Sequence, residues 1–353
     1  MTWQCAAIDH GVTFYEDGKI APCCMVDHTY RKNAQEIFND PFADLKTGSP
    51  PAVCKVCVDT EASGMNSYRQ GFNVKKHNKP GVQFVDIRNT NLCNFKCRSC
   101  GPYNSNLWAK ELGEVNSIRH FSLDNYKDII INDAVQSIYY TGGEPMINIE
   151  HWDILEELIV KGLSKNITLQ YNSNMSVLKF KDRDILSIWE KFKSVQVVAS
   201  IDAIGKKFDY IRSGGDWESV VNNINILKSA NVTLRIGTTV SILNLWFIEE
   251  LLMFFKAQSI TVNLTDLQYP EQWSLSAIPD DLKTQALVCV DKIEKIYHDK
   301  NRCNYMRQQI NNNVQQYLFR DTVMQTLLLD KIRNEHLFDY LPFKQSAMKL
   351  MSL

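Results

Sequence analysis

The chain has 353 residues, of which 44% are hydrophobic, and its formal net charge is −1. This length and composition allow a sizeable buried core in one large domain or two smaller ones. The balanced charge argues against a broad electrostatic surface, so we expect neither a nucleic-acid partner nor an anionic membrane partner.

The sequence lacks the usual signals for export or membrane insertion. Its N-terminus has no basic region followed by an apolar signal-peptide core. The most apolar stretch, residues 245–255, is interrupted by Glu249 and Glu250 and is too short to cross a bilayer. We therefore expect a cytoplasmic protein.

The first part of the chain, residues 1–73, is irregular and rich in cysteine. Residues 12–24 have a hairpin pattern, in which apolar residues flank the turn signal Glu16-Asp17-Gly18. The polar stretch 75–81 contains Pro80-Gly81, which favours a turn, and it is the first predicted domain boundary.

From residue 82 the pattern becomes regular, with candidate strands that alternate with amphipathic helices. The predicted strands are 82–88, 135–141, 167–173, 195–202, 232–240 and 260–268. The predicted helices between them are 104–113, 151–163, 182–192, 217–230 and 245–258. Six such units predict an α/β fold with a parallel sheet, as a partial barrel or a doubly wound sheet, with its chemistry at the carboxyl ends of the strands.

After about residue 270 no further strands are predicted, and residues 279–340 read as helices. We therefore expect three parts: an N-terminal cysteine-rich domain (1–80), an α/β core (81–270) and a C-terminal helical extension (271–353).

Eight of the ten cysteines lie within the first hundred residues. In a reducing cytosol such clustering indicates metal binding rather than disulfides. The other two, Cys289 and Cys303, fall in helical sequence and are expected to be ordinary thiols.

Three cysteines, Cys93, Cys97 and Cys100, follow the first core strand with the spacing C-x3-C-x2-C. Three thiolates on a four-iron cluster leave one iron without a protein ligand, and a catalytic metal site needs such an open position. A zinc site with its fourth ligand elsewhere remains an alternative.

A second motif, Thr141-Gly142-Gly143-Glu144-Pro145, ends the second core strand. Paired glycines let the backbone approach a ligand closely, and a carboxylate accepts hydrogen bonds from an ammonium group. Taken alone, the motif could also be an ordinary turn.

The two motifs together resemble those of the radical S-adenosylmethionine (SAM) superfamily. The resemblance implies a partial (β/α)6 TIM-like barrel in which a [4Fe–4S] cluster on Cys93, Cys97 and Cys100 binds SAM at its open iron. It implies that Gly142, Gly143 and Glu144 hold the amino group of SAM.

Further SAM contacts follow from the same resemblance at later strand ends. It implies that Asn174 contacts SAM and that Val240 or its neighbours face the adenine. Ser200, Asp202 and Arg212 match the S-x-D … R pattern of the peptide-modifying branch, with the first two near the ribose and the arginine at the SAM carboxylate.

One position departs from the family pattern. Ser99 stands before the third cysteine, where the family usually has an aromatic residue that packs on the adenine. We expect Phe95, Tyr103 or the fifth core strand to hold the adenine instead.

A second cysteine set resembles the first half of the SPASM motif, which forms a twitch domain with one auxiliary [4Fe–4S] cluster. The cysteines of this set are Cys5, Cys23, Cys54 and Cys57, and Gly18 occupies the glycine position of the motif. Four thiolates close a cluster. Here the set precedes the barrel, whereas it usually follows it; a zinc ribbon is the alternative, and Cys24 could replace Cys23 as a ligand.

The resemblance implies an enzyme that cleaves SAM reductively to methionine and a 5′-deoxyadenosyl radical, which abstracts hydrogen from a substrate. It implies an electron donor of the flavodoxin or ferredoxin type and favours a peptide or protein side chain as substrate. A sugar or nucleotide is the alternative substrate. A non-catalytic iron–sulfur or zinc protein, or an electron-transfer protein, is the alternative of another class.

Four further residues are candidates for contact with substrate. Asp86 and Arg88 share one face of the first core strand, and Tyr269 and Glu271 follow the sixth. The alternative is a structural ion pair and a turn at the barrel rim.

Overall fold

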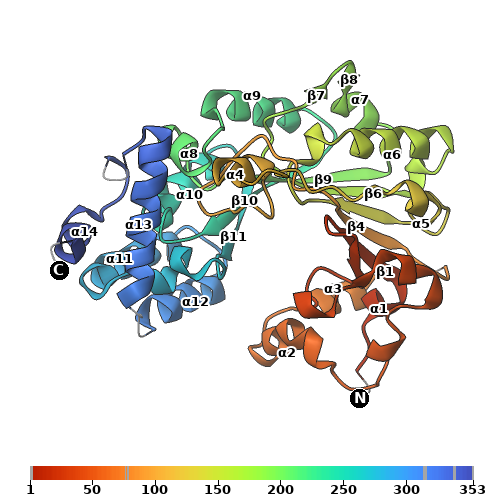
Figure 1. Ribbon diagram of the computed structural model, residues 1–353, viewed down its shortest axis with the longest axis horizontal. Helices are drawn as coiled ribbons and strands as arrows, with labels where there is room; N and C mark the ends of the chain where they lie inside the picture. Colours follow the sequence, from red (N-terminus) through yellow and green to blue (C-terminus); the bar gives the residue numbers. More distant parts are fainter. Residues whose placement is uncertain (1–2, 76, 78, 313–315, 337–338, 352–353) are drawn as a thin grey trace.

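A nine-stranded sheet with the order β11-β10-β9-β6-β5-β4-β1-β2-β3 organises the chain (Figure 1). The computed structural model describes residues 3–75, 77, 79–312, 316–336 and 339–351. The predicted mixed α/β class is therefore confirmed.

The six strands of the predicted α/β core are mutually parallel, as the alternation of strand and helix predicts. They are β4 (Phe84–Arg88), β5 (Ser137–Tyr140), β6 (Thr168–Ser173), β9 (Ser194–Ser200), β10 (Thr233–Val240) and β11 (Thr261–Asp266). Each falls within, or one residue outside, a predicted strand. Within the described part of the chain β11 pairs only with β10, so the sheet stays open at this edge.

The N-terminal segment continues the sheet rather than forming a separate one. Strand β1 (Gly11–Tyr15) pairs in parallel with β4, from Gly11 opposite Phe84 to Tyr15 opposite Arg88. Strands β2 (Lys19–Ala21) and β3 (Lys32–Asn33) then add antiparallel. The predicted hairpin is confirmed, whereas the sequence pattern did not predict the pairing of β1 with the core.

Helices follow the core strands and cover one face of the sheet (Figure 1). They are α4 (Asn106–Glu111), α6 (Ile149–Val160), α7 (Ile185–Trp189), α8 (Lys206–Ile211), α9 (Trp217–Lys228) and α10 (Ile248–Lys256). Other short elements are α1 (Ala6–His10), α2 (Lys55–Ala62), α3 (Tyr68–Asn73), α5 (Lys127–Ile130) and the hairpin of β7 (Lys179–Phe180) and β8 (Arg183–Asp184).

The two faces of the parallel sheet differ in burial because successive side chains of a strand point to opposite sides. On β6, Leu169 and Tyr171 are buried in the main core, whereas Gln170 and Asn172 between them are partly exposed. Positions in register with these on the neighbouring strands are also partly or fully exposed, and they are mostly polar. We call this the open face; it includes Tyr139, Gln170, Asn172, Ser200, Arg235, Thr239 and Asn263.

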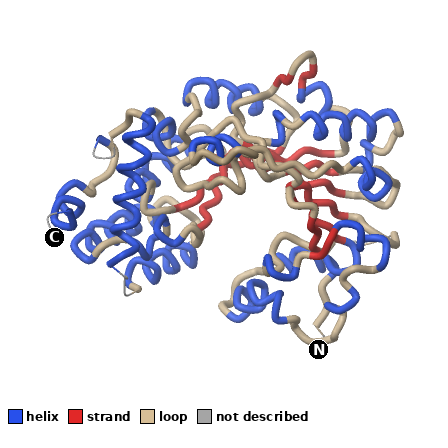
Figure 2. The backbone as a smooth tube through the Cα atoms, in the orientation of Figure 1, coloured by secondary structure: helices blue, strands red, loops and turns tan. Residues whose placement is uncertain are grey.

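The C-terminal part is helical, as predicted. It comprises α11 (Asp280–Glu294), α12 (Lys300–Asn311), α13 (Gln316–Arg333) and α14 (Lys344–Met351). Residues 313–315 and 337–338 of the predicted helical stretch lie outside the described residues. Figure 2 shows these helices and the N-terminal segment at opposite ends of the sheet. None of the described helices is long and apolar enough to cross a membrane.

Candidate functional site

The loop that carries Cys93, Cys97 and Cys100 leaves the carboxyl end of β4 and is held by backbone hydrogen bonds. The Lys96 N–H donates to the Ser213 carbonyl at 2.8 Å, and the Arg98 N–H donates to the Ile211 carbonyl at 2.7 Å. The end of α8 and the residues that follow it therefore fix the position of this cysteine loop (residues 93–105).

The three thiols of the cysteine loop lie close enough to influence one another. Burial raises the pKa of each of the three thiols. The charge of Cys97 raises the pKa of Cys93 and of Cys100 further. The pKa of Cys100 rises to about 12. Without a cation these thiols are therefore protonated near neutral pH. A metal centre that binds them must supply the positive charge that stabilises the thiolates.

Two donors already point at sulfur atoms of this loop. The Phe95 N–H donates to Cys93 Sγ at 3.4 Å, and Arg212 Nη1 donates to Cys97 Sγ at 3.8 Å. Hydrogen bonds of this kind favour thiolate ligands. Within the described residues, no three histidine, cysteine or carboxylate side chains converge closely enough to hold a single metal ion. In a four-iron cluster each cysteine binds a different iron.

The glycine loop after β5 packs directly on the cysteine loop. The Gly143 N–H donates to the Thr90 carbonyl at 3.0 Å, and the Glu144 N–H donates to the Leu92 carbonyl at 2.7 Å. A Cβ on Gly143 would lie 2.0 Å from the Leu92 carbonyl oxygen. The first function of this glycine is therefore to let two backbone segments meet.

The Glu144 carboxylate is buried and ties three segments together. It accepts hydrogen bonds from the Met146 N–H at 3.1 Å, from Ser173 Oγ at 2.7 Å and from the Asn174 N–H at 2.7 Å. Burial raises its pKa, and these donors oppose the rise. Asn174 continues the connection, because its side-chain amide donates to Asn94 Oδ1 of the cysteine loop at 2.9 Å.

Arg212 lies where the cysteine loop meets the ends of β9 and β10. Its Nη2 pairs with Asp202 at 2.9 Å, and Asp202 also accepts the Thr239 N–H at 2.9 Å. Arg212 Nε is buried and has no hydrogen-bond partner among the described residues. An unpaired guanidinium N–H beside Cys97 fits the carboxylate of a ligand bound there, because buried donors are otherwise almost always satisfied.

Ser200 and Val240 occupy different faces of the sheet. Ser200 ends β9 on the open face, opposite Gly237 of β10. Val240 is fully buried in the core behind the sheet, whereas its neighbour Thr239 lies on the open face. At the carboxyl end of this strand, Thr239 rather than Val240 is therefore available to a ligand.

The two aromatic residues near Ser99 also differ in placement. Phe95 is buried and packs against Phe208, so it belongs to the core. Tyr103 is 68% exposed, and the Arg119 guanidinium lies over its ring.

The sequence model of the family described as the radical SAM superfamily matches residues 87–254. This range includes the cysteine loop, the glycine loop and Arg212. Residues 87–254 are a radical SAM domain. The range therefore covers most of the parallel sheet, from the end of β4 to α10.

Curated relatives resemble this chain at low identity. An uncharacterised protein of Methanocaldococcus jannaschii is 24% identical over 54% of this chain and 65% of its own length. A GTP 3',8-cyclase of Sulfurimonas denitrificans is 24% identical over 59% of this chain and 62% of its own length. The chain thus matches less than two thirds of the length of these relatives.

Two solved structures resemble this chain over part of their length. One is anSMEcpe with bound AdoMet and Cp18Cys peptide, with 19% identity and a TM-score of 0.43 over 60% of this chain and 59% of that one. The other is SuiB of Streptococcus suis bound to the precursor peptide SuiA, with 16% identity and a TM-score of 0.42 over 73% of this chain and 52% of that one.

Outside the radical SAM domain, the N-terminal cysteines form a second group. Burial raises the pKa of Cys5 and Cys23, and of Cys54 to about 11, and in each case neighbouring cysteines of the set add to the rise. The charge of Cys57 raises the pKa of each of these three thiols. The thiols within electrostatic reach of Cys57 thus come from three segments: Cys5 just before α1, Cys23 on the loop after β2, and Cys54 just before α2.

The vicinal thiol Cys24 has different neighbours. It interacts with the Asp86 carboxyl and the Tyr68 hydroxyl, and burial raises its pKa to about 11. Asp86 in turn pairs with Arg88 at 3.0 Å. The Cys24 side chain thus points toward the sheet, at the place where the N-terminal segment covers β4.

Gly18, at φ +75°, supplies the left-handed turn of the hairpin.

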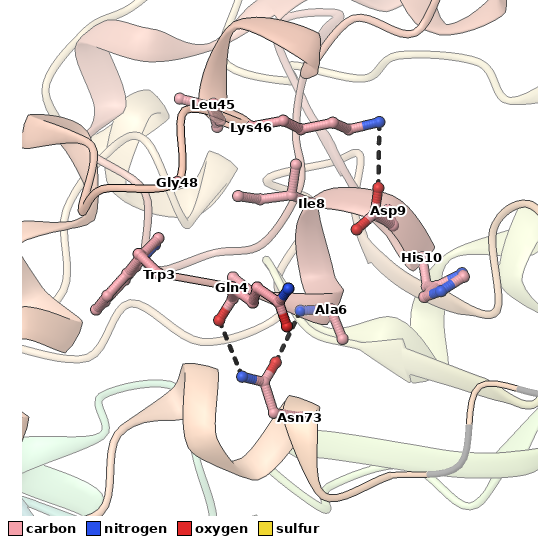
Figure 3. A pocket seen from close by; sticks show the side chains of 11 residues that line it. Trp3, Gln4, Ala6, Ile8, Asp9, His10, Leu45, Lys46, Gly48 and Asn73 are labelled. Carbon is pink, nitrogen blue, oxygen red and sulfur yellow. Dashed lines mark hydrogen bonds and ion pairs between the residues drawn. The ribbon is translucent and has the colours of Figure 1, made fainter. Parts of the chain in front are cut away.

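A cavity of about 660 Å³ opens beside Cys5 in the N-terminal segment (Figure 3). Lys46 forms an ion pair with Asp9 at 3.1 Å beside the cavity. The Asn73 side chain donates a hydrogen bond to the Gln4 carbonyl and accepts one from the Ala6 N–H. Among the four cysteines of the set, Cys5 is the one that lines it.

The four candidate substrate contacts are not brought together by neighbouring strands. Asp86 and Arg88 lie on β4, whereas Tyr269 and Glu271 follow β11 at the open edge of the sheet. Tyr269 is 84% exposed, and Asp86 is fully buried. Sequence patterns did not predict the buried ion pairs that Arg98 and Arg333 form behind the cysteine loop.

Proposed function

We propose that this chain binds a [4Fe–4S] cluster on Cys93, Cys97 and Cys100 with SAM at its open iron, and modifies a peptide or protein side chain by radical chemistry. The observation that carries the proposal is Arg212. Its guanidinium reaches Cys97 and Asp202 and retains a buried, unpaired Nε. A cation so placed suits a ligand carboxylate beside an iron–sulfur cluster.

The residues around the cysteine loop then take separate roles. The bound cluster and SAM would supply reductive cleavage and a 5′-deoxyadenosyl radical. Arg212 holds the SAM carboxylate, and the backbone of Gly142 and Gly143 with Glu144 Oε2 receives the amino group. Asp202 keeps Arg212 oriented through their 2.9 Å ion pair.

The nucleoside part of SAM would lie along the ends of the middle strands. Ser200 lies at the ribose on the open face, and Asn174 steadies this region through its bond to Asn94 at 2.9 Å. Thr239, next to the buried Val240, is the β10 residue that meets the adenine. Each of these roles places a polar group at a strand end, where parallel sheets bind ligands.

We further propose that Cys5, Cys23, Cys54 and Cys57 hold an auxiliary cluster of the twitch type in a domain formed by residues 1–80. Their mutual electrostatic influence supports one shared centre. The contacts of Cys24 with Asp86 and Tyr68 favour Cys23 as the ligand. Two clusters need an external electron donor, for which a flavodoxin or ferredoxin fits.

A peptide substrate is favoured by the open face. Partly exposed polar positions extend over five neighbouring strands, from Tyr139 on β5 to Asn263 on β11. An elongated polar surface suits an extended chain better than a compact ligand. Arg88 lies at the β4 end of this face, where its partly exposed guanidinium, paired with the buried Asp86, is available to a polar group of the substrate.

A nucleotide substrate is the second candidate. It is supported by the similarity to the GTP 3',8-cyclase of Sulfurimonas denitrificans, at 24% identity. The two candidates are separable, because a nucleotide substrate would be consumed in the absence of any peptide.

The test is the formation of 5′-deoxyadenosine from SAM by anaerobically reconstituted protein with a strong reductant. The wild type and the control Cys303→Ala should form it, and Cys97→Ala should not. Protein that is loaded with iron but binds no SAM would overturn the proposal. Incubation with GTP, and separately with a library of peptides, then decides the substrate class by mass spectrometry of the products.

A further inference from the structure

Helix α13 is tied to the cysteine loop through a buried arginine of the loop itself. Arg98 lies between Cys97 and Cys100, and its side chain is fully buried. Its Nη2 donates to Asp330 of α13 at 2.6 Å and also to Glu335. Its Nε donates to the Tyr210 carbonyl at 3.0 Å, and the Tyr210 ring packs under the guanidinium.

A second arginine, which belongs to α13 itself, connects this helix to α4, the helix that directly follows the cysteine loop. Arg333, at the end of α13, donates from Nη2 to Glu111 of α4 at 2.6 Å and from Nε to the same carboxylate at 3.2 Å. It also lies over the ring of Trp108, 5.0 Å from the centroid. Trp108 Nε1 donates to the Cys97 carbonyl at 2.7 Å.

The charges of both pairs are almost completely removed from water. The side chains of Arg98 and Asp330 are 0% and 7% exposed, and those of Arg333 and Glu111 are 2% and 7% exposed. Removing one partner of a buried pair leaves an uncompensated charge, which is strongly unfavourable. The cysteine loop in this conformation therefore requires α13 in its docked position.

We propose that Arg98 and Arg333 are positioning residues through which α13 holds the cysteine loop in the conformation that binds the cluster. We call Arg98, Glu111, Asp330, Arg333 and Glu335 the α13 clamp. The proposal rests on the cluster site proposed above. It assigns to the C-terminal helices a direct part in shaping that site, although α13 carries none of its cysteines.

The experiment compares four proteins: wild type, Arg333→Met, Arg333→Lys and the control Arg307→Met. Arg307 also bridges two carboxylates, Asp291 at 2.8 Å and Glu294 at 2.7 Å, but on α11. Hydrogen exchange of the apoprotein reports on residues 93–111. Electron paramagnetic resonance of the reduced, reconstituted protein reports on the cluster itself.

We expect Arg333→Met to raise exchange in residues 93–111 by roughly tenfold or more, because the buried Glu111 carboxylate loses its two-pronged partner and keeps only the partly exposed Lys96. The resonance signal should broaden or shift as Cys97 and Cys100 move. Arg333→Lys keeps the charge but loses the two-pronged bond, so it should give an intermediate result. Arg307→Met should match the wild type in both measurements.

Two results would overturn different statements. If Arg333→Met leaves both the exchange and the resonance signal unchanged, even with a lower melting temperature, α13 has no positioning role. If the wild type itself assembles no cluster on Cys93, Cys97 and Cys100, the proposed function fails instead, and the exchange data still show whether α13 holds the loop.

Discussion

Gly143 approaches Leu92 so closely that a Cβ on the glycine would lie 2.0 Å from the Leu92 carbonyl oxygen. The atom that it would meet belongs to the backbone, so a side-chain movement cannot relieve the clash. The contact joins the end of β5 to the start of the cysteine loop. Any separation of the two segments would also stretch the Glu144 N–H bond to the Leu92 carbonyl, which measures 2.7 Å.

Gly143→Ala should therefore destabilise the fold by about 1–3 kcal/mol, as overpacking in a close contact does. The control is Gly101→Ala in the same cysteine loop, because a Cβ on Gly101 would meet nothing within 4 Å. Thermal unfolding of the apoproteins measures both. Equal melting temperatures for the two variants would show that the backbone yields at Gly143.

Arg212→Met should weaken SAM binding by cluster-loaded protein roughly tenfold to a hundredfold, because a hydrogen bond to a charged group contributes about 1.5–3 kcal/mol. A matched control is Arg235→Met, which removes an exposed arginine from the open face of β10. Isothermal titration of SAM gives the two affinities. Unchanged binding by Arg212→Met would remove this arginine from the SAM site.

The two cysteine sets predict a simple pattern of iron content. Cys97→Ala and Cys54→Ala should each lose one cluster, about four irons. Cys24→Ala should keep the full content, because the Cys24 thiol contacts Asp86 and Tyr68. Colorimetric iron and sulfide assays after anaerobic reconstitution provide the counts. Loss of iron from Cys24→Ala, with full content in Cys23→Ala, would exchange the two residues as ligands.

The sequence predicted the parallel core well because each of its strands carries a local signal. Leu169 and Tyr171 alternate with Gln170 and Asn172, and this period of two is visible within a few residues. The cysteine and glycine loops could also be placed, since each directly follows such a strand. One register step was harder to predict: Val240 is buried behind the sheet and Thr239 faces the open side.

Long-range polar contacts could not be predicted in this way. Arg98 and Asp330 are 232 residues apart in sequence, and no local pattern at either position predicts that they pair. Their pairing depends on how α13 packs, which is a property of the whole fold. The same is true of β1, whose pairing with β4 joins segments on the two sides of a predicted boundary.

A buried histidine behind the sheet makes the stability of the protein depend on pH. His151 on α6 is fully enclosed by aromatic rings, including Tyr140 and Trp152. Its Nε2 bonds the Tyr171 hydroxyl at 3.0 Å. Burial lowers its pKa from 6.5 to about 3, because a charged imidazolium would lose its hydration there.

Between these two pKa values the unfolded chain binds a proton that the folded protein does not bind. The contribution of His151 is thus complete above about pH 6.5 and is lost as the pH falls toward 3, by about 1.4 kcal/mol per pH unit. His151→Phe should remove this slope, whereas the exposed control His28→Gln should retain it. Urea unfolding at a series of pH values measures the free energy of unfolding. Parallel pH profiles for His151→Phe and the wild type would mean that the folded protein protonates His151, and that the aromatic cage opens in acid.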